Sequence, residues 1–403
     1  MAMTDDAADL RDDLVRLRRE LHREPEIGLE LPRTQERVLG ALDGLPLEIT
    51  TGERISSVTG VLRGGRPGPT VLLRGDMDAL PVTERTGVPY ASAVEGAMHA
   101  CGHDLHTAML VGAARLLATR RAELAGSVVF MFQPGEEGFR GAEHMIVEGV
   151  LEASGERPVA AYGLHVASSL LPNGWFAARP GPVLAAADQV RVTVRGVGGH
   201  GAQPHLAKDP VPAACEMVLA LQTFVTRAFD VFDPVVLTVG SFHAGTKENV
   251  IPDSAEFGVT LRSFSEVSHA RIKDGVVQVV RGIAAAHGLT VEIEFFMSYP
   301  VTINDAAETG FAEATIGSLF GPDRYVPLPN PLTASEDFSL VLNEVPGAFV
   351  FLGACPADRD VSTAPFNHAA DAAFDDGVLP DGAALLAALA QRRLTADAER
   401  LVT

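Results

Sequence analysis

Three apolar runs with the character of β-strands constrain the fold of this chain more than any other feature of its sequence. They cover residues 70–73, 128–132 and 160–164, and helical patterns such as 107–119 lie between them. Strands that alternate with helices are typical of a mainly parallel sheet, so the predicted fold class is α/β. Each run leads directly into polar residues. Because ligands of open α/β sheets bind at the carboxyl ends of strands, these residues are candidates for a functional site.

A different pattern occupies the middle of the chain. It predicts strand, helix, strand, strand, helix and strand in turn, over residues 189–195, 211–228, 235–242, 255–262, 267–287 and 289–295. This β-α-β-β-α-β order is ferredoxin-like. Strand-like sequence resumes afterwards at 349–353, so the block is predicted to be inserted into the first domain.

The length of 403 residues also favours two domains. We expect a catalytic domain formed by residues 1–186 and 299–403. The inserted domain is expected at 187–298.

Composition and charge exclude several classes of protein. With 47% hydrophobic and 21% charged residues the chain is typical of a globular enzyme. Its formal net charge of -20 disfavours nucleic acid and anionic membranes as partners. The acidic N-terminal sequence does not resemble a signal peptide, and no segment forms an uninterrupted apolar span, so a cytoplasmic location is predicted. The three cysteines, an odd number, argue against a disulfide framework.

The segment MHACGHDLH, residues 98–106, places a thiol, imidazoles and a carboxylate where a loop enters a predicted helix. A thiol near a helix N-terminus or beside a metal has a lowered pKa, so Cys101 can present the thiolate that a divalent metal prefers. His103 can reach the same metal. An isolated pair of this kind is more often structural, but the neighbouring motifs favour a metal site.

Glu136 and Glu137 follow the apolar run VVFMFQ. Consecutive residues that leave a strand point in different directions, so one carboxylate can bind a metal while the other serves as a general base. Adjacent glutamates are common on solvated loops. Their position after a buried strand favours the functional interpretation.

Two more histidines complete the candidate metal site, because His165 closes an apolar run and His368 lies in the loop FNHAAD. Together with Cys101, His103 and one of the two glutamates, they suffice for two metals if one ligand bridges and water fills the remaining positions.

Several carboxylates and histidines are expected to support the metal site without binding a metal. Asp76 and Asp78 leave their strand on the same face, so one of them can orient a ligating histidine, and a solvated turn is the alternative. Asp78 is counted among the candidate catalytic residues. Support without a defined role is also expected from Asp104, His106, Glu336 and Asp337.

The glycine-rich segment GGHGAQPH, residues 198–205, lacks the Lys-Ser/Thr ending of a phosphate loop, so we reject a nucleotide site there. Arg262 is a candidate for binding a substrate carboxylate, because its guanidinium offers a bidentate match to that group. A surface ion pair is the alternative for Arg262.

At this point the sequence resembles the metallo-aminoacylase and carboxypeptidase superfamily, in particular its amidohydrolase branch of hippurate hydrolases and indole-acetyl-amino-acid hydrolases. The resemblance covers nearly the whole chain. It is carried, in order, by LHREPEIGLE, RGDMDALPV, MHACGHDLHTAML, QPGEEGFRGA, GLHV, GGHGAQPH, ENVIPDSAEFGVTLR, SEDFS and NHAADAAF.

The resemblance implies a role for each group in the candidate site. It implies Glu136 as the catalytic base, and as metal ligands Cys101, His103, Glu137, His165 and His368. It further implies that the inserted domain forms a homodimer or tetramer, and that His200 and Asn249 help to complete an active site. The resemblance leaves two alternatives for His200, the site of its own subunit and that of the partner. The cofactors would be two divalent ions, manganese or zinc first, with cobalt or nickel as alternatives.

The predicted function is hydrolysis of N-acyl amino acids to a carboxylic acid and a free amino acid. A dipeptidase or carboxypeptidase of the same fold is the nearest alternative. A non-catalytic binder of amino-acid conjugates, or a protein with a structural metal, is a more distant one.

Overall fold

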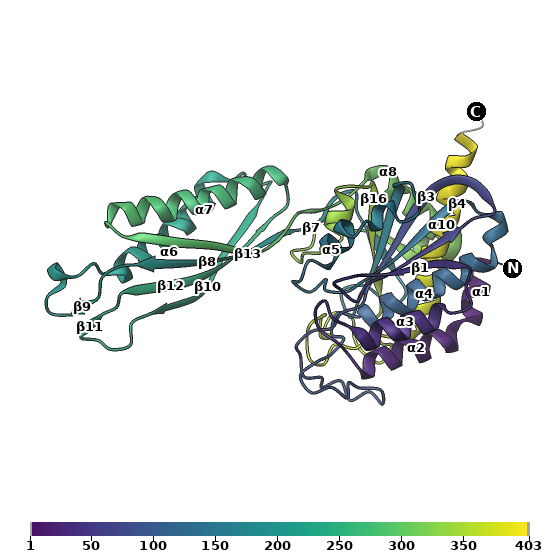
Figure 1. Cartoon of the computed structure of the whole chain (residues 1–403), viewed down its shortest axis with the longest axis horizontal. Coiled ribbons are helices and arrows are strands. Elements are labelled where there is room, and N and C mark those ends of the chain that lie inside the picture. Colours follow the sequence, from purple (N-terminus) through teal and green to yellow (C-terminus); the bar gives the residue numbers. More distant parts are fainter. Residues whose placement is uncertain (1, 401–403) are drawn as a thin grey trace. The chain divides into compact units, whose positions relative to one another are not determined.

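The structure, a computed structural model, describes residues 2–400, and internal contacts divide it into two compact units. The first unit contains the chain up to Gly181, Ile303–Asn330, and the chain from Leu340 onward. The second unit contains Pro182–Thr302 and Pro331–Ser339. Figure 1 shows the elements of each unit.

The first unit is built around an eight-stranded sheet in the order β1-β2-β4-β3-β5-β16-β6-β15. Its strands are β1 (Leu47–Thr51), β2 (Val58–Arg63), β3 (Arg66–Asp76), β4 (Ala125–Gln133), β5 (Pro158–Ala167), β6 (Phe176–Ala178), β15 (Tyr325–Pro327) and β16 (Gly347–Gly353). The central strands β4, β3, β5 and β16 run parallel, whereas β1 and β2 are antiparallel. The predicted α/β class with a mainly parallel sheet is confirmed.

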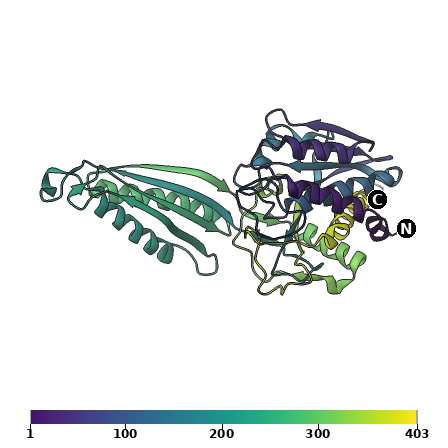
Figure 2. The ribbon, with the colours of Figure 1, turned by 90° about the horizontal axis from the view of Figure 1, so that it is seen from below.

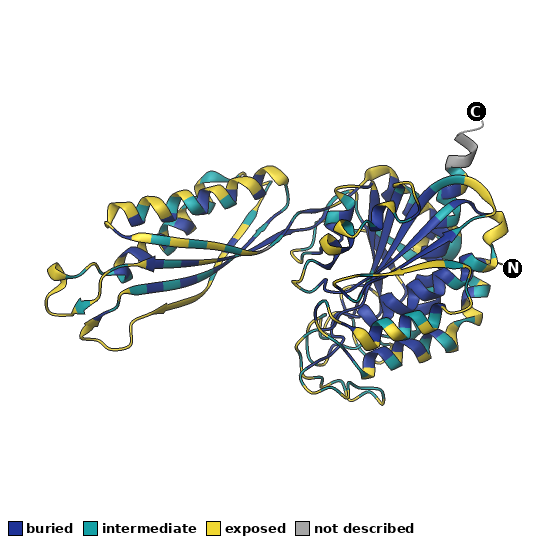
Figure 3. Cartoon of the chain, in the orientation of Figure 1, coloured by how far each residue is buried: buried dark blue, intermediate teal, exposed yellow. Residues whose placement is uncertain are grey.

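The helices of the first unit include one that is buried on nearly all sides. They are α1 (Met3–Asp9), α2 (Arg11–Arg23), α3 (Pro32–Leu42), α4 (His103–Thr119), α5 (Gly141–Val147), α8 (Ala306–Phe320) and α10 (Leu379–Arg400). Helix α4 contacts both β3 and α10, and Figure 3 shows it among the buried elements. At Gly112 a Cβ atom would lie 2.7 Å from the Cβ of Ala383, so only glycine permits this close approach of α4 and α10.

The second unit contains a four-stranded antiparallel sheet in the order β10-β12-β8-β13. Its elements in chain order are β8 (Ala186–Arg195), β9 (Gly199–His200), α6 (Pro210–Ala228), β10 (Val235–Ala244), β11 (Val250–Ile251), β12 (Ser254–Ser263), α7 (Glu266–Ala286) and β13 (Thr290–Tyr299). Strand β12 alternates buried and half-buried residues, as expected when one face packs against helices. Figure 2 shows α6 and α7 on the same face of this sheet. The order of elements and strands is ferredoxin-like.

Three short elements lie at or near the boundaries between the units. Strands β7 (Gly181–Leu184) and β14 (Thr302–Asn304) occur where the chain passes from one unit to the other, and α9 (Ser339–Leu342) follows the added segment of the second unit. None of the helices in the described range 2–400 combines the length and apolarity required to cross a membrane.

Candidate active site

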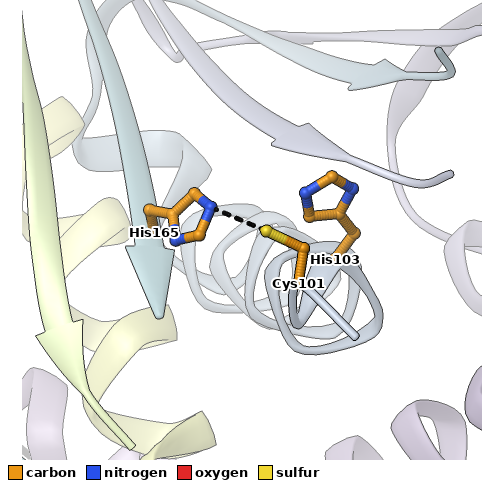
Figure 4. A group of neighbouring side chains, drawn as sticks. All are labelled: Cys101, His103 and His165. Carbon is orange, nitrogen blue, oxygen red and sulfur yellow. Dashed lines mark hydrogen bonds between the residues drawn. The ribbon is translucent and has the colours of Figure 1, made fainter. Parts of the chain in front are cut away.

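A sharp loop before α4 brings Cys101 and His103 to the carboxyl end of β5. Gly102 has a φ of 84°, and a Cβ there would lie 2.3 Å from Cγ2 of Val166, so this position requires glycine. Cys101 and His103 are both buried. Figure 4 shows that Cys101 points toward His165 of β5, whose Nε2 lies 3.4 Å from Sγ.

Cys101 lies at the centre of the predicted ligand cluster. Its Sγ is 3.2 Å from Nε2 of His368, and that nitrogen is 3.1 Å from Oε1 of Glu137. Two of the groups of side chains that are spaced closely enough to hold a metal contain this thiol: Cys101, His103 and His165 form the first, and Cys101, Glu137 and His368 form the second. The structure therefore brings all the predicted ligands together and places the thiol in both groups.

The ligand atoms fit divalent metals. His103 is fully buried, and neither of its ring nitrogens has a hydrogen-bond partner among the described residues. Carboxylate oxygens of Asp76 and Asp78 lie 3.5 Å from Nε2 and 3.4 Å from Nδ1, at ion-pair distance. Buried polar atoms are normally hydrogen-bonded, so an imidazole without such a bond is a candidate metal ligand. The ring of His165 donates from Nδ1 to the carbonyl of Val166 at 2.9 Å, so Nε2, which faces Sγ of Cys101, is the nitrogen that can bind a metal. Thiolate, imidazole and carboxylate together suit zinc and its neighbours in the first transition series.

Asp78 holds both glutamates and lies beside a ligand. Its two carboxylate oxygens accept the backbone N–H groups of Glu136 and Glu137, each at 3.0 Å. Oδ1 also lies 3.4 Å from Nδ1 of His103. One carboxylate thus fixes the start of the loop after β4 and the orientation of a candidate ligand.

Asp76 belongs to a buried network behind the cluster. It contacts Nη1 of Arg74 and Nδ1 of His106, both at 2.6 Å. Burial alone would raise the pKa of Asp76, but Arg74, His103 and His106 outweigh it and hold the pKa well below its usual range. On its other side, Nε2 of His106 accepts the N–H of Val166 at 2.8 Å. His106, which had no assigned role, therefore links the ends of β3 and β5.

Two side chains of α2 contact the carboxylate of Asp104. Nε of Arg18 lies 2.8 Å from the carboxylate, and Nδ1 of His22 lies 2.7 Å from it. Burial would raise the pKa of Asp104, but these cations lower it strongly. Arg18 and His22 were not singled out in the sequence. The available signal was His22 in the motif LHREPEIGLE, which packs next to the motif that carries Cys101.

His368 is the most exposed of the candidate ligands, with 53% of its side chain accessible. Its φ of 75° lies in the left-handed region, which is unusual for a residue other than glycine and often occurs at functional sites. Contacts with Cys101 and Glu137 raise the pKa of His368 to about 10. A metal that binds His368 must therefore displace a proton.

Glu136 is buried beside the cluster. A carboxylate oxygen of Glu136 lies within 4.8 Å of a ring nitrogen of His103 and of a carboxylate oxygen of Glu137. Glu136 belongs to neither of the two groups that contain Cys101. Its carboxylate therefore lies directly beside the candidate metal ligands.

The remaining predicted residues belong to the second unit, where they form two separate locations. His200 and Asn249 lie close together, because β9 pairs with β11 and the N–H of Gly201 donates to the carbonyl of Asn249 at 2.9 Å. Arg262 lies near the other end of β12, roughly 26 Å along the strand from Ser254.

Arg262 is half-buried and its guanidinium already has protein partners. It donates to Oγ1 of Thr260 and the carbonyl of Leu261, each at 2.8 Å, and to the carbonyl of Thr333 at 3.2 Å. Burial lowers the pKa of Arg262. Glu336 and Asp337 are also assigned to the second unit, and Oε1 of Glu336 accepts the N–H of Phe338 at 2.9 Å.

Comparison with known proteins connects this fold and cluster to one family. The model of peptidase family M20/M25/M40 matches residues 72–392. Thermostable carboxypeptidase 2 of Saccharolobus solfataricus is 36% identical over 392 residues, which cover 96% of this chain and 97% of the relative. The IAA-amino acid hydrolase ILR1-like 4 of Arabidopsis thaliana is 37% identical over 390 residues, which cover 96% of this chain and 87% of the relative.

A solved structure agrees with these relatives. The YXEP protein of Bacillus subtilis, described as a dinuclear metal binding peptidase from the M20 family, has a TM-score of 0.80 and 31% identity. The match covers 96% of this chain and 99% of that chain.

The fold, the ligand cluster and these likenesses define a metal-dependent amidohydrolase. The chain belongs to the peptidase family M20/M25/M40. The predicted resemblance and the predicted class of enzyme are confirmed.

Proposed function

We propose that this protein hydrolyses N-acyl amino acids to a carboxylic acid and a free amino acid, using two divalent metal ions. One observation carries the proposal: a single thiol, Cys101, belongs to both metal-ligand groups, and the carboxylate of Glu136 lies beside them. One group uses His103 and His165, and the other uses Glu137 and His368. Two divalent metals held by these groups, with the carboxylate of Glu136 beside them, would be suited to amide hydrolysis.

In the proposed reaction, water adds to the amide carbon and the C–N bond breaks. When bound, the two metals supply Lewis acidity, which polarises the amide carbonyl and lowers the pKa of water. Glu136 takes a proton from the attacking water and delivers it to the leaving nitrogen, so that its carboxylate is regenerated. Asp78 keeps Glu136 in place through the backbone N–H that it accepts.

The second unit is proposed to supply substrate contacts and the oligomer interface. His200 would stabilise negative charge on the amide oxygen, Asn249 would support it, and Arg262 would bind the substrate carboxylate. The separation of Arg262 from His200 along the sheet is compatible with His200 serving the site of a partner subunit in a homodimer or tetramer. Edge strand β10 exposes Val236 and Phe242, and an exposed apolar edge suits pairing with a second copy.

Manganese or zinc is the proposed metal, with cobalt or nickel as alternatives. A small-molecule substrate, no nucleic acid, no membrane and a cytoplasmic location complete the proposal. The net charge of -20 supports the absence of nucleic acid and membrane partners.

N-acyl amino acids are preferred over peptides as the proposed substrates because an IAA-amino acid hydrolase is among the relatives. A carboxypeptidase of similar identity favours a second candidate, cleavage of a C-terminal peptide bond. Both reactions release an amino acid with a free carboxylate. They differ only in the acyl side of the bond.

The test is amine release from N-acetyl, N-benzoyl and indole-acetyl amino acids and from dipeptides. The protein is first stripped with a chelator and then assayed with and without added manganese or zinc. Hydrolysis of acyl-amino acids that requires added metal is the expected result. Hydrolysis of dipeptides alone would favour the carboxypeptidase or dipeptidase activity, and metal binding without hydrolysis of any substrate would contradict the proposal.

A further inference from the structure

The side chain of Asn367 lies at the meeting point of three segments that carry candidate metal ligands. Nδ2 donates to the carbonyl of Cys101 at 3.2 Å and to the carbonyl of Val166 at 3.0 Å. Sγ of Cys101 lies 3.8 Å from the same nitrogen. His368, the third ligand-bearing position, is the next residue in the chain.

The oxygen of the same amide also accepts two hydrogen bonds. Oδ1 accepts the N–H of Ser168 at 2.9 Å and its hydroxyl at 3.0 Å. The hydroxyl of Ser168 also lies 2.9 Å from the carbonyl of Pro365, two residues before Asn367. These bonds fasten the loop that contains His368 to the end of β5.

The carbonyl of Val166 connects Asn367 to the orientation of His165. It accepts the ring N–H of His165 at 2.9 Å and the amide N–H of Asn367 at 3.0 Å. The same carbonyl therefore sets the tautomer of one ligand and anchors the loop that carries another.

The backbone of His368 needs such an anchor. Its φ of 75° is a strained conformation for a residue other than glycine, which surrounding contacts must offset. The main-chain contact at this residue is the N–H bond to the carbonyl of Ala100 at 2.8 Å. By contrast, His103 and His165 are held by a buried helix and a central strand.

We propose that Asn367 is a positioning residue for the metal centre. Its amide docks the loop of His368 onto segments already fixed by the sheet, and so sets the affinity of the metal group that contains Glu137 and His368. The inference rests on the proposed function, because it requires two metals. It assigns to Asn367 control over the affinity for one of the two metals.

The experiment uses the full chain with Asn367→Asp and Asn367→Ala. Asn367→Asp keeps the shape and the acceptor for Ser168, but it places an oxygen against the carbonyls of Cys101 and Val166. Asn173→Ala is the matched control, since Nδ2 of Asn173 also bridges two loop segments, the carbonyl of Cys355 and the carboxylate of Asp375, away from the ligands. Stripped proteins are titrated with Co²⁺, the thiolate-to-cobalt absorption is followed, and bound metal is counted by elemental analysis.

The expected result is selective weakening of the second binding event. In both Asn367 variants the second Co²⁺ should bind roughly 10- to 100-fold more weakly, whereas the first should stay within about threefold of wild type. The control should bind both ions as wild type does. A purely structural role would weaken both events together or neither, and either result would overturn the proposal.

Two further outcomes separate this inference from the proposed function. A wild-type chain that binds only one Co²⁺ would overturn both. Two unchanged binding events in Asn367→Asp, with wild type binding two, would overturn the inference alone. Should Asn367→Ala fail to fold, Asn367→Asp carries the test, and a melting temperature measured without metal shows that the stripped variant is folded.

Discussion

Each unit contains a buried cluster of histidine and aspartate, and the two clusters differ in how their atoms are paired. In the second unit, Asp188 accepts from Nε2 of His269 at 2.7 Å and from Oγ of Ser298 at 2.6 Å, and Lys273 lies 3.2 Å away. In the first unit, neither ring nitrogen of His103 has a hydrogen-bond partner among the described residues.

The difference separates a cluster that stabilises the fold from one that is prepared for a ligand. A satisfied buried network contributes to folding, whereas unpaired buried groups cost free energy until something binds them. Substitutions in the cluster of the first unit should therefore change chemistry and metal binding. Substitutions in the second cluster should change stability.

The largest expected effect is on turnover. Glu136→Gln removes the proposed base while leaving both Cys101 groups intact, so turnover should fall on the order of a hundredfold or more with unchanged metal content. Glu143→Gln is the matched control, because Glu143 pairs with Arg140 on the exposed face of α5 and should leave turnover unchanged. The measurement combines amine release with elemental analysis. Near-normal turnover of Glu136→Gln would show that Glu136 is not the base, and that the cluster of the first unit does not use it for chemistry.

A smaller effect is expected on the stability of the second unit. Asp188→Asn removes the anion that His269, Ser298 and Lys273 share, and should lower the free energy of unfolding by about 2 kcal/mol. Hydrogen exchange of the amides in β8, β12 and β13 measures this loss, while fluorescence of Trp175, the single tryptophan, reports on the first unit.

The control for Asp188→Asn is Glu256→Gln. Glu256 lies 3.6 Å from Arg191 on the same sheet, and about half of each side chain is exposed, so the change in stability should be well under about 1 kcal/mol. Equal effects of the two substitutions, or loss of metal from Asp188→Asn, would contradict the assignment of a stabilising role to the second cluster.

The smallest effect is a dependence on pH. Burial would raise the pKa of Asp188, but hydrogen bonds from His269 and Ser298 outweigh it and lower the pKa. A lowered folded pKa stabilises the protein above the unfolded value of about 3.9, and this contribution is lost as pH falls through the folded pKa.

The measurement is the difference in unfolding free energy between wild type and Asp188→Asn from pH 7 down to pH 3. It should be constant above roughly pH 4 to 5 and then shrink by up to about 1.4 kcal/mol for each unit by which the pKa is lowered. A difference that grows on acidification would contradict the lowered pKa of Asp188.

The sequence predicted those parts of the fold and site that depend on local pattern. Apolar runs predicted β3, β4 and β5, and the shared carboxyl edge of parallel strands explains why residues that follow them meet. The assignment of Glu136 as base and Glu137 as ligand came from family resemblance and remains a prediction.

Other features depend on contacts between distant segments and had no local signal. Asp104 is held by Arg18 and His22, which lie more than 80 positions earlier, so nothing around Asp104 reveals its partners. The grouping of Pro331–Ser339 with the second unit likewise follows from tertiary contacts. The sequence marked Asn367 only as the neighbour of His368. Its proposed role depends on hydrogen bonds to backbone groups of distant residues, and a sequence does not show which backbone groups a side chain will meet.

The central position of β16 determines when the catalytic machinery can be completed during biosynthesis. This strand lies between β5 and β6, although the ribosome makes it after the entire second unit. A nascent chain therefore exposes the unpaired edges of β5 and β6 until β16 emerges, and such edges promote aggregation and chaperone binding. During this time Cys101 and His165 are already synthesised, whereas His368 is not. The candidate metal group that contains Glu137 and His368 can therefore be completed only near the end of synthesis.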